Sequence, residues 1–459
     1  MSSTTKKSHV AALAFPFASH PNVLLHLVQK LAAAAPNVTF SFFNTTISNQ
    51  KLFSTIKLHG GYENIKSYDV HDGAPEGYVF SGNPLDPINY FIKATPDNFK
   101  KRLEEVVDET GLKISCLLTD AFLGFSAEIA KELGIPWVPF WTAGPHSLSA
   151  HLYTDAILKA LASAGGAQNE DRTLEFLPGL SAIHASDLPI ELLSDNLDQP
   201  FPKMLYNMIL AFPRAKAIVQ NCFDGLDPTV TNDLKSKLNQ VLNIGPLVLP
   251  SQESSFKLED QFNCLAWLNK QEKSSVAYIC FGTMLTPPPQ ELLALTEAIQ
   301  EKNVPYIWSF QDDSKLPMLK EFFERTNNIG KVVPWTPQLE VLAHQSVGVF
   351  ITHCGWSSLM ESIACGVPMI CRPFFGDQKL NRRVIEDVWQ IGVGIKGGVL
   401  TKGGMLSALD MVLEMEIGNK MRVNIAQLKE CATKAVAENG SSCENFKILL
   451  EIVTSSQDE

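Results

Sequence analysis

The sequence predicts an α/β protein built from two doubly wound, Rossmann-like domains that face each other across a cleft. Apolar runs of strand length alternate with helical stretches, which is typical of parallel sheets covered by helices on both faces. The alternation restarts after a polar, proline-containing segment at residues 246–260. A chain of 459 residues is also too long for one ordinary domain. We therefore expect an N-terminal domain at residues 1–245, a linker at 246–260 and a C-terminal domain at 261–459, whose last helix can pack back on the first.

The first half contains four apolar runs of strand length. We predict buried strands at residues 10–17, 38–43, 114–119 and 137–141. Between these runs, periodic apolar positions predict helices at residues 21–34, 98–110 and 126–133. The first run includes VAALAFPFA, which we interpret as a buried strand and not as a signal peptide, because a proline interrupts it and no convincing cleavage site follows.

The second half repeats this alternation. SSVAYICFG at residues 274–282 predicts a strand, and PPPQELLALTEAIQEKN at 287–303 predicts a helix with proline at its start. YIWSF at residues 306–310 predicts the next strand. Periodic segments at residues 423–438 and 443–453 are expected to form closing helices.

Composition and charge exclude several classes of protein. The net charge of −11 argues against a nucleic-acid partner or an anionic membrane surface, since both favour basic proteins. No apolar run approaches the roughly 20 residues that span a bilayer, so no membrane insertion is expected. The nine cysteines form no C-x-x-C motif, which indicates free thiols in a reducing, cytoplasmic setting. The sequence contains no Asp-x-Asp motif, so nothing of that kind indicates a bound metal. We expect a monomer without metal or other cofactor.

Residues 335–378 carry the most specific pattern in the chain. The apolar run VGVFITH leads directly into a helix start, CGWSSLMES. A helix N-terminus after a strand favours anions, because free backbone N–H groups and the positive end of the helix dipole point at one spot. His353, Gly355, Trp356 and Ser358 surround that spot, and Glu361 lies one turn further along the same face as Ser358. The pattern predicts a site for a diphosphate and a ribose diol.

Two polar residues follow predicted strands of the first domain. His20 ends AFPFASH, and Asp120 ends CLLTD. Because the carboxyl ends of parallel strands converge at one sheet edge, the two side chains can meet. An imidazole is a suitable general base near neutral pH, and a carboxylate on its other nitrogen fixes the tautomer. From spacing alone, a structural role for His20 remains open.

Gly392, Gly394 and Gly397 fit G-x-G-x-x-G, the pattern of a dinucleotide site. That site requires a strand before the glycines and a helix after them. Here the glycines follow a helical stretch and precede GVLTKGG, which is not helical. We therefore predict no dinucleotide site.

The stretch at residues 335–378 resembles the signature box of plant UDP-dependent glycosyltransferases almost residue for residue. The resemblance implies the GT-B fold, with the acceptor bound mainly by the first domain and the UDP-sugar by the second. It implies that Trp335 stacks on uracil and that Gln338 and Glu361 hold the ribose. The implied UDP-sugar contacts as a whole are Thr142, Thr283, Trp335, Thr336, Gln338, His353, Gly355, Trp356, Ser357, Ser358, Glu361, Asp377 and Gln378.

The resemblance also divides the remaining roles in the box. His353, Trp356 and Ser358 would bind the phosphates, and Asp377 and Gln378 would bind the sugar hydroxyls. In the family, glutamine at the last position is associated with glucose and histidine with galactose. FPFASH and TDAF match the family's catalytic base and its partner, so the resemblance makes His20 and Asp120 catalytic.

One position of the box departs from the family. Ser357 stands where the family has asparagine after the tryptophan. A serine hydroxyl is shorter than an asparagine amide and has one O–H donor where the amide has two. We expect weaker binding of the sugar donor, not its loss.

Across almost the whole chain, the sequence is most similar within this family to flavonoid 3-O-glucosyltransferases. AFPFASH, TDAFLGF, WTAGPHSLSAHLYTD, ASDLP, TPPPQEL and RPFFGDQ carry that resemblance. It implies inverting transfer of glucose from UDP-glucose to a flavonol or anthocyanidin. The expected acceptor contacts are Phe17, Ser19, Phe122, His151, Phe201 and Phe375, with Phe15 beside them. Two alternatives stay open: transfer to another small acceptor such as a terpenoid, hormone or simple phenol, and a weakly active UDP-sugar-binding protein.

Overall fold

The computed structural model describes residues 8–58, 63–79, 83, 85–163, 172–193, 199–250, 260–312 and 314–455. The chain divides into two compact units. The first comprises Met1–Gln168, Ile190–Leu247 and Val436–Glu459, and the second comprises Asn169–Pro189 and Val248–Ala435. Most of the predicted linker, residues 251–259, lies outside the described residues. Residues 169–189 group with the second unit, although they precede the boundary that we placed at residue 245.

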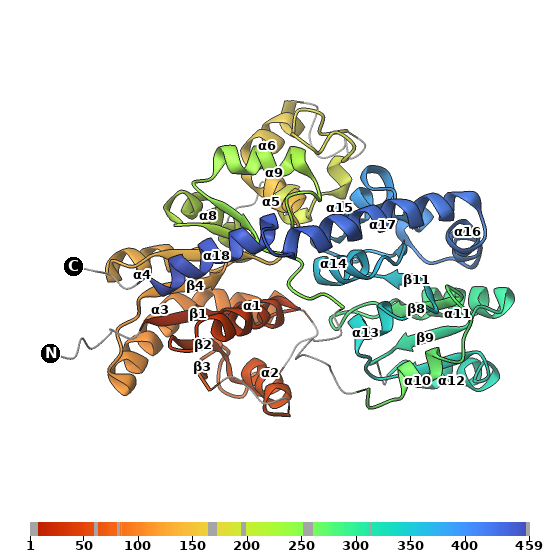
Figure 1. The fold of residues 1–459 in the computed structure, drawn as a ribbon, viewed down its shortest axis with the longest axis horizontal. Coiled ribbons are helices and arrows are strands. Elements are labelled where there is room, and N and C mark those ends of the chain that lie inside the picture. The colour runs from red at the N-terminus through yellow and green to blue at the C-terminus, as the bar shows by residue number, and fades with distance from the viewer. Residues whose placement is uncertain are drawn as a thin grey trace. The chain divides into compact units, whose positions relative to one another are not determined.

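The first unit contains a seven-stranded parallel sheet in the order β3-β2-β1-β4-β5-β6-β7. Its strands β1 to β4 are labelled in Figure 1. Its strands are β1 (His9–Leu13), β2 (Thr39–Thr45), β3 (Ile65–Val70), β4 (Cys116–Asp120), β5 (Trp137–Trp141), β6 (Ile218–Gln220) and β7 (Val241–Asn243). Its helices are α1 (His20–Ala34), α2 (Thr46–Leu58), α3 (Leu85–Thr110), α4 (Ser126–Leu133), α5 (Pro145–Leu152), α6 (Thr154–Ser163), α7 (Ile190–Leu193), α8 (Pro200–Ala211), η2 (Phe212–Arg214), α9 (Pro228–Lys237) and α18 (Ser441–Thr454).

Separate apolar layers cover the two faces of this sheet. One layer includes Leu103 of α3, Met208 of α8 and Leu234 of α9. The other includes Leu27 of α1 together with Leu449 and Val453 of α18. The last helix of the chain thus packs on the first sheet, and it contacts β7, β4 and β1.

The second unit contains a six-stranded parallel sheet in the order β10-β9-β8-β11-β12-β13. Its strands are β8 (Val276–Cys280), β9 (Tyr306–Ser309), β10 (Gly330–Val333), β11 (Val347–Thr352), β12 (Met369–Cys371) and β13 (Gly392–Gly394). Its helices are η1 (Ala185–Asp187), α10 (Cys264–Leu268), α11 (Pro289–Lys302), α12 (Leu316–Arg325), α13 (Gln338–Leu342), α14 (Trp356–Cys365), α15 (Gln378–Arg383), the π-helix η3 (Val384–Val388), η4 (Lys396–Gly398), α16 (Lys402–Leu413) and α17 (Glu416–Val436). The predicted pair of Rossmann-like domains is therefore confirmed, each unit taken by itself.

Several element boundaries differ from the prediction. The first strand ends at Leu13, not at residue 17, because Pro16 lacks the N–H that a continuing ladder requires. Helix α3 begins at Leu85 and runs through Pro96, so it starts 13 residues before the predicted position 98. Gly392 and Gly394 lie within strand β13 and not after it, so this glycine pattern lacks the strand–turn–helix context of a dinucleotide site. The expectation that GVLTKGG is not helical was wrong for its last three residues, because α16 begins at Lys402.

Candidate active site

Two neighbouring strands of the first sheet bring His20 and Asp120 together. Leu13 of β1 pairs with Thr119 of β4, and Asp120 is the last residue of β4. After β1 the chain turns through Ala18, whose φ of 53° lies in the left-handed region that non-glycine residues seldom adopt. His20 then begins α1, and its Nδ1 lies 2.7 Å from Oδ2 of Asp120. The structure thus forms the predicted pair.

The carboxylate of Asp120 is fully buried and holds the imidazole in one orientation. Its Oδ1 accepts a hydrogen bond from the backbone N–H of Phe122 at 2.9 Å. Since the carboxylate can only accept, His20 donates through Nδ1–H, which leaves Nε2 as the basic nitrogen. The Oγ1 atom of Thr142 lies 3.0 Å from the same Nδ1. Thr142, predicted as a contact of the donor sugar, is therefore also a neighbour of the base.

Aromatic side chains surround the imidazole of His20. Its ring centroid lies 4.7 Å from that of Phe122 and 5.2 Å from that of Phe15. Phe17 lies 5.0 Å from Phe15, and Phe201 of α8 lies 6.2 Å from Phe122, both in edge-on geometry. Phe17, Phe122 and Phe201 are half-buried, whereas Phe15 is buried and supports them from behind. Phe122 thus lies directly against the imidazole, and Phe17 and Phe201 extend the half-buried apolar wall beyond Phe15 and Phe122.

The other predicted acceptor residues lie in different settings. Ser19 is exposed at the N-cap of α1, and its hydroxyl does not cap the helix. His151 is buried, with its ring centroid 5.4 Å from that of Trp141. Desolvation lowers the pKa of His151 to about 4, so this imidazole is neutral near pH 7. Phe375 belongs to the second unit, where 44% of its surface is exposed.

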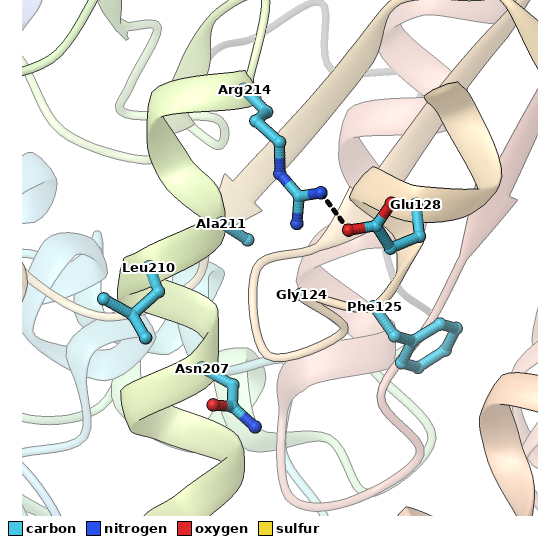
Figure 2. Close-up of a pocket in the computed structure, with 7 residues that line it drawn as sticks. All are labelled: Gly124, Phe125, Glu128, Asn207, Leu210, Ala211 and Arg214. Atoms are coloured by element: carbon cyan, nitrogen blue, oxygen red, sulfur yellow. Dashed lines mark hydrogen bonds and ion pairs between the residues drawn. The ribbon is translucent and has the colours of Figure 1, made fainter. Parts of the chain in front are cut away.

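A hollow of about 340 Å³ in the first unit lies apart from these residues (Figure 2). It lies between α4 and α8, where Arg214 forms an ion pair with Glu128. Gly124 lines it and permits close approach of α8, since a Cβ atom there would lie 2.8 Å from Cα of Met208. None of the predicted catalytic or acceptor residues lines this hollow.

In the second unit, β11 leads into α14 as predicted. The N-cap of α14 is Gly355, so no side chain caps the first turn. The imidazole of His353 packs against glycines on two sides, because a Cβ atom at Gly355 would lie 2.4 Å and one at Gly282 2.9 Å from its ring. Desolvation lowers the pKa of His353 to about 4, and its buried Nδ1 has no hydrogen-bond partner within the described structure. His353 is thus a neutral imidazole beside an uncapped helix start, an arrangement suited to an anion.

Gln338 and Glu361, which we predict to bind the ribose, are in direct contact. The Nε2 of Gln338 donates to Oε2 of Glu361 at 2.6 Å and to Oγ of Ser358 at 3.1 Å. Tyr278 of β8 donates to Oε1 of Gln338 at 3.0 Å, and Thr336 lies 2.7 Å from the Tyr278 hydroxyl. Desolvation raises the pKa of Glu361 to about 7, although the hydrogen bond from Gln338 acts in the opposite direction.

The loop that carries Asp377 and Gln378 is tied down by side chains. Gln378 is buried, and its Oε1 accepts the N–H of Phe374 at 2.8 Å and that of Phe375 at 3.2 Å. Oδ2 of Asp377 accepts from Nδ2 of Asn381 at 3.0 Å, and the same amide donates to the carbonyl of Cys354 at 2.9 Å. Asn381 therefore links this loop, which we term the sugar loop after the predicted role of Asp377 and Gln378, to the start of α14.

Three further residues of the predicted UDP-sugar site differ in exposure. Trp335 is partly exposed, and Thr283 is exposed on the turn after β8. The hydroxyl of Ser357 is buried without a hydrogen-bond partner within the described structure. A buried polar atom without a partner is costly, so Ser357 marks a place where a polar ligand atom or a water fits.

The comparisons with known proteins agree with this geometry. A family model described as "UDP-glucoronosyl and UDP-glucosyl transferase" matches residues 254–431. The chain is 51% identical to a flavonol 3-O-glucosyltransferase of Actinidia chinensis var. chinensis, over 99% of this chain and 98% of that one. It is 49% identical to an anthocyanidin 3-O-glucosyltransferase of Vitis vinifera, over 100% of both chains. A crystal structure of a UDP-glucose: anthocyanidin 3-O-glucosyltransferase in complex with UDP is 41% identical and superposes with a TM-score of 0.90, over 98% of this chain and 99% of that chain.

The protein is a UDP-dependent glycosyltransferase.

Four residues of this glycosyltransferase support the site without having been predicted. Tyr278 and Asn381 make the contacts described above. Arg372 donates from Nε and Nη2 to the two carboxylate oxygens of Glu291, at 2.9 and 2.5 Å, and from Nη1 to the carbonyl of Pro373 at 2.6 Å. This buried pair fixes the start of the sugar loop. Tyr278 lies in a predicted strand, and Asn381 lies four residues after Asp377. Glu291 and Arg372 are 81 positions apart in the sequence, so their pairing gives no local signal.

The glycosyltransferase offers no metal-binding cluster of three or more His, Cys, Asp or Glu side chains in the part of the chain that the structure describes. Within the same residues, no helix is both long and apolar enough to cross a membrane. The nine cysteines carry no disulfide, and Cys431 is the exposed one among them. Free thiols agree with the expectation from cysteine spacing.

Proposed function

We propose that this glycosyltransferase transfers glucose from UDP-glucose, with inversion, to the 3-hydroxyl of a flavonoid such as a flavonol or an anthocyanidin. The observation that carries the proposal is the His20–Asp120 pair, in which Nδ1 is engaged by the carboxylate and the imidazole ring lies against the half-buried Phe122. The names of the relatives support the acceptor class and the 3-hydroxyl. A flat aromatic acceptor suits a wall formed by Phe17, Phe122 and Phe201.

In the proposed reaction, Nε2 of His20 removes the proton from the acceptor hydroxyl. The acceptor oxygen forms a bond to the anomeric carbon, the bond from that carbon to the β-phosphate oxygen breaks, and UDP leaves with the electron pair. The buried carboxylate of Asp120 stabilises the imidazolium, as a carboxylate does for other histidine bases. Thr142, 3.0 Å from the same Nδ1, further restrains the ring.

We assign the second unit to the UDP-sugar. Trp335 would stack on uracil, and Gln338 and Glu361 would bind the ribose hydroxyls. The uncapped start of α14 and the neutral imidazole of His353 would receive the diphosphate, which helix termini favour. Gly355, Trp356, Ser357 and Ser358 would line the same turn, and Asp377 and Gln378 would bind the glucose hydroxyls. Thr283 and Thr336 are the remaining residues of the second unit that we assign to the UDP-sugar.

These donors are sufficient to hold the leaving diphosphate, so we propose a reaction that needs no metal ion. We also propose that the protein acts as a monomer in the cytoplasm. Its free cysteines and net charge of −11 support a reducing compartment without a nucleic-acid or anionic-membrane partner.

A panel of acceptors with UDP-glucose tests the proposal. The panel contains a flavonol, an anthocyanidin, a terpenoid alcohol and a simple phenol, and NMR of each product gives the glucosylated position and anomeric configuration. We expect the flavonoids to have the highest kcat/KM and to give β-glucosides at the 3-hydroxyl. A higher kcat/KM with the terpenoid or the simple phenol would show that the preferred acceptor is not a flavonoid. No transfer to any acceptor, with UDP still bound, would favour a UDP-sugar-binding protein.

A further inference from the structure

Residues 172–189 form a short closed loop within the second unit, between two stretches of chain that belong to the first. The N–H of Leu174 donates to the carbonyl of Ile183, and the N–H of Ala185 donates to that of Arg172, both at 2.9 Å. An antiparallel bridge joins Thr173 to His184. The leucines of residues 172–189 are buried, namely Leu174, Leu177, Leu180 and Leu188. These contacts hold the segment, which we term the strap, as one body that ends in η1.

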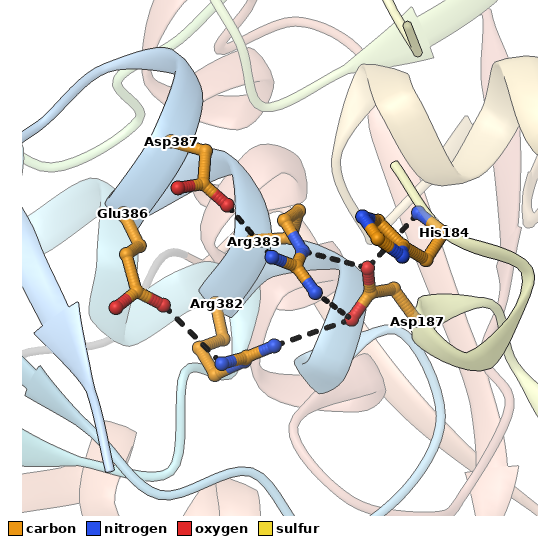
Figure 3. A network of polar contacts seen from close by, with 6 residues as sticks. All are labelled: His184, Asp187, Arg382, Arg383, Glu386 and Asp387. Carbon is orange, nitrogen blue, oxygen red and sulfur yellow. Dashed lines mark hydrogen bonds and ion pairs between the residues drawn. The ribbon is translucent and has the colours of Figure 1, made fainter. Parts of the chain in front are cut away.

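Asp187 attaches the strap to α15, as Figure 3 shows. Its Oδ2 lies 2.7 Å from Nε of Arg383, and its Oδ1 lies 3.3 Å from Nη2 of Arg382. The N–H of His184 donates to the same Oδ2 at 3.1 Å, which fixes the carboxylate to its own backbone. The carboxylate is 4% exposed, while the two arginines are about one-fifth exposed. The ion pairs are thus largely shielded from water. Shielded pairs are stronger than pairs on the surface.

The other acidic partners of the two arginines cannot replace Asp187. Arg382 also pairs with Glu386 at 3.2 Å, and Arg383 pairs with Asp387 at 2.8 Å. Both acids lie four residues after their arginine on the same helical stretch, so their ion pairs connect that stretch only to itself. Among the ion pairs that these arginines form within the described residues, those to Asp187 alone join α15 to a distant segment of the chain.

The opposite end of α15 carries the residues assigned to the glucose. Asp377 is the N-cap of α15 and Gln378 is its first residue, while Arg382 and Arg383 are its last two. The arginine end also lies tightly against β13, because a Cβ atom at Gly394 would lie 2.7 Å from Nη1 of Arg382. A six-residue helix is about 9 Å long and behaves as a rigid rod. A shift at one end therefore moves the other.

We propose that Asp187 is a positioning residue for the donor sugar. By holding Arg382 and Arg383, it fixes α15 and with it the places of Asp377 and Gln378. The glycines of the G-x-G pattern take part in the same arrangement, since Gly394 leaves room for the arginine. This inference rests on the proposed function, because that proposal assigns the glucose contacts to Asp377 and Gln378.

Steady-state kinetics with UDP-glucose and UDP-galactose, together with calorimetric binding of UDP, tests the role of Asp187. In Asp187→Asn, we expect the KM for UDP-glucose to rise about three- to tenfold and the preference for glucose to fall, because small misplacements of binding groups are costly. The affinity for UDP should stay within about twofold, since the residues assigned to UDP lie on other elements than α15. A general loss of structure would instead weaken UDP and both sugars alike.

Matched variants separate this role from a general effect of charge. Asp387→Asn removes a carboxylate from the same Arg383 but breaks no link to a distant segment of the chain, so we expect wild-type kinetics. Arg383→Gln should resemble Asp187→Asn, and the double variant should be no worse than either single one. If Asp187→Asn does not fold, Arg383→Lys retains the charge, loses the fork of the guanidinium and should show the same sugar effect in weaker form.

Gln378→Ala, measured in parallel, separates this inference from the proposed function. If Gln378→Ala reduces the preference for glucose and Asp187→Asn does not, the role of Asp187 is wrong and the sugar assignment stands. If Gln378→Ala leaves the preference unchanged, the sugar assignment fails and the role of Asp187 fails with it. Parallel losses of UDP affinity and activity in Asp187→Asn would also overturn the inference.

Discussion

Nδ1 of His20 lies 2.7 Å from Oδ2 of Asp120, although 100 residues separate them in the sequence. The contact depends on the parallel pairing of β1 with β4, which places the carboxyl ends of both strands at the same edge. The aspartate is fully buried, and the imidazole is partly exposed. The buried carboxylate orients the imidazole through Nδ1, and the second nitrogen, Nε2, is left for a substrate.

Removal of the base should abolish most of the turnover. We expect His20→Ala to lower kcat by about 10²- to 10⁴-fold, because proton removal from the acceptor is lost. Asp120→Asn should also be severely impaired, since an amide cannot stabilise the imidazolium as a carboxylate does. The affinity for UDP, measured by calorimetry, should remain close to that of the wild type in both variants.

His71 provides the matched control for this prediction, since its side chain in the first unit is 70% exposed and His71→Ala should retain full activity. Near-normal turnover of His20→Ala with a weakly acidic acceptor would contradict the assignment of the base.

Chelation should leave the reaction unchanged. We expect EDTA to have essentially no effect on the rate, because the start of α14 and His353 can receive the leaving diphosphate without a cation. The measurement is the initial rate with UDP-glucose before and after dialysis against EDTA. Complete loss of activity that Mg²⁺ or Mn²⁺ restores would refute this account of the leaving group.

The raised pKa of Glu361, about 7 in the free protein, predicts a pH dependence for UDP binding. Ribose hydroxyls donate hydrogen bonds, so they favour the ionised carboxylate. Below pH 7, binding must first remove a proton from Glu361, and the affinity should fall as the pH decreases, by up to about tenfold per pH unit. The measurement is the dissociation constant of UDP between pH 5.5 and pH 8, values that we choose to bracket the pKa.

Glu361→Gln is the control for the pH series, because glutamine has a similar shape but does not titrate. UDP itself also titrates, so only the difference between the wild type and this variant reports on Glu361. If both proteins show the same pH dependence, Glu361 does not contact the ribose as an ionised group.

The fold was predictable where the elements are long and buried. Strands β1, β4 and β5 contain five residues each, all buried, and the apolar runs located them. Strand β3 was missed because most of its residues are partly or fully exposed, and β6 and β7 were missed because three residues give no periodic signal. Stabilisation of such short strands comes from neighbours in the sheet, which local sequence does not show.

The candidate site shows the same division. Motif residues such as His353 and Glu361 were found because they lie close together along one helix start. The supporting contacts were missed, because Glu291 and Arg372 are 81 residues apart and Asp187 and Arg383 are 196 residues apart. Ion pairs of this kind depend on tertiary packing, so a single sequence gives no spacing rule for them.

The enzyme should prefer UDP-glucose to UDP-galactose. Gln378 is buried, and its Oε1 is already engaged by the N–H groups of Phe374 and Phe375, so its amide can present only Nε2 to a sugar hydroxyl. Inversion of one hydroxyl would leave a buried polar group unpaired, at about 1–3 kcal/mol. The ratio of kcat/KM for the two donors measures this preference, and a higher value with UDP-galactose would refute it.

Restoring the family's amide at position 357 should improve use of the donor. The hydroxyl of Ser357 is buried without a partner in the first turn of α14, which leaves a place that water can fill. Ser357→Asn can reach further and supply a direct hydrogen bond, which contributes about 0.5–1.5 kcal/mol. We therefore expect a severalfold higher kcat/KM for UDP-glucose. The KM for the acceptor should hardly change, because we assign the acceptor mainly to the first unit.

Steady-state kinetics of Ser357→Asn, with each substrate varied in turn, separates this gain from overpacking. If the surrounding turn has adapted to serine, the larger side chain would clash and lower the activity. Ser357→Ala is the comparison variant, because it removes the hydroxyl without adding a donor, so its kcat/KM for UDP-glucose should not exceed that of the wild type. An unchanged or lower kcat/KM for UDP-glucose in Ser357→Asn would mean that the serine is no deficit in this enzyme.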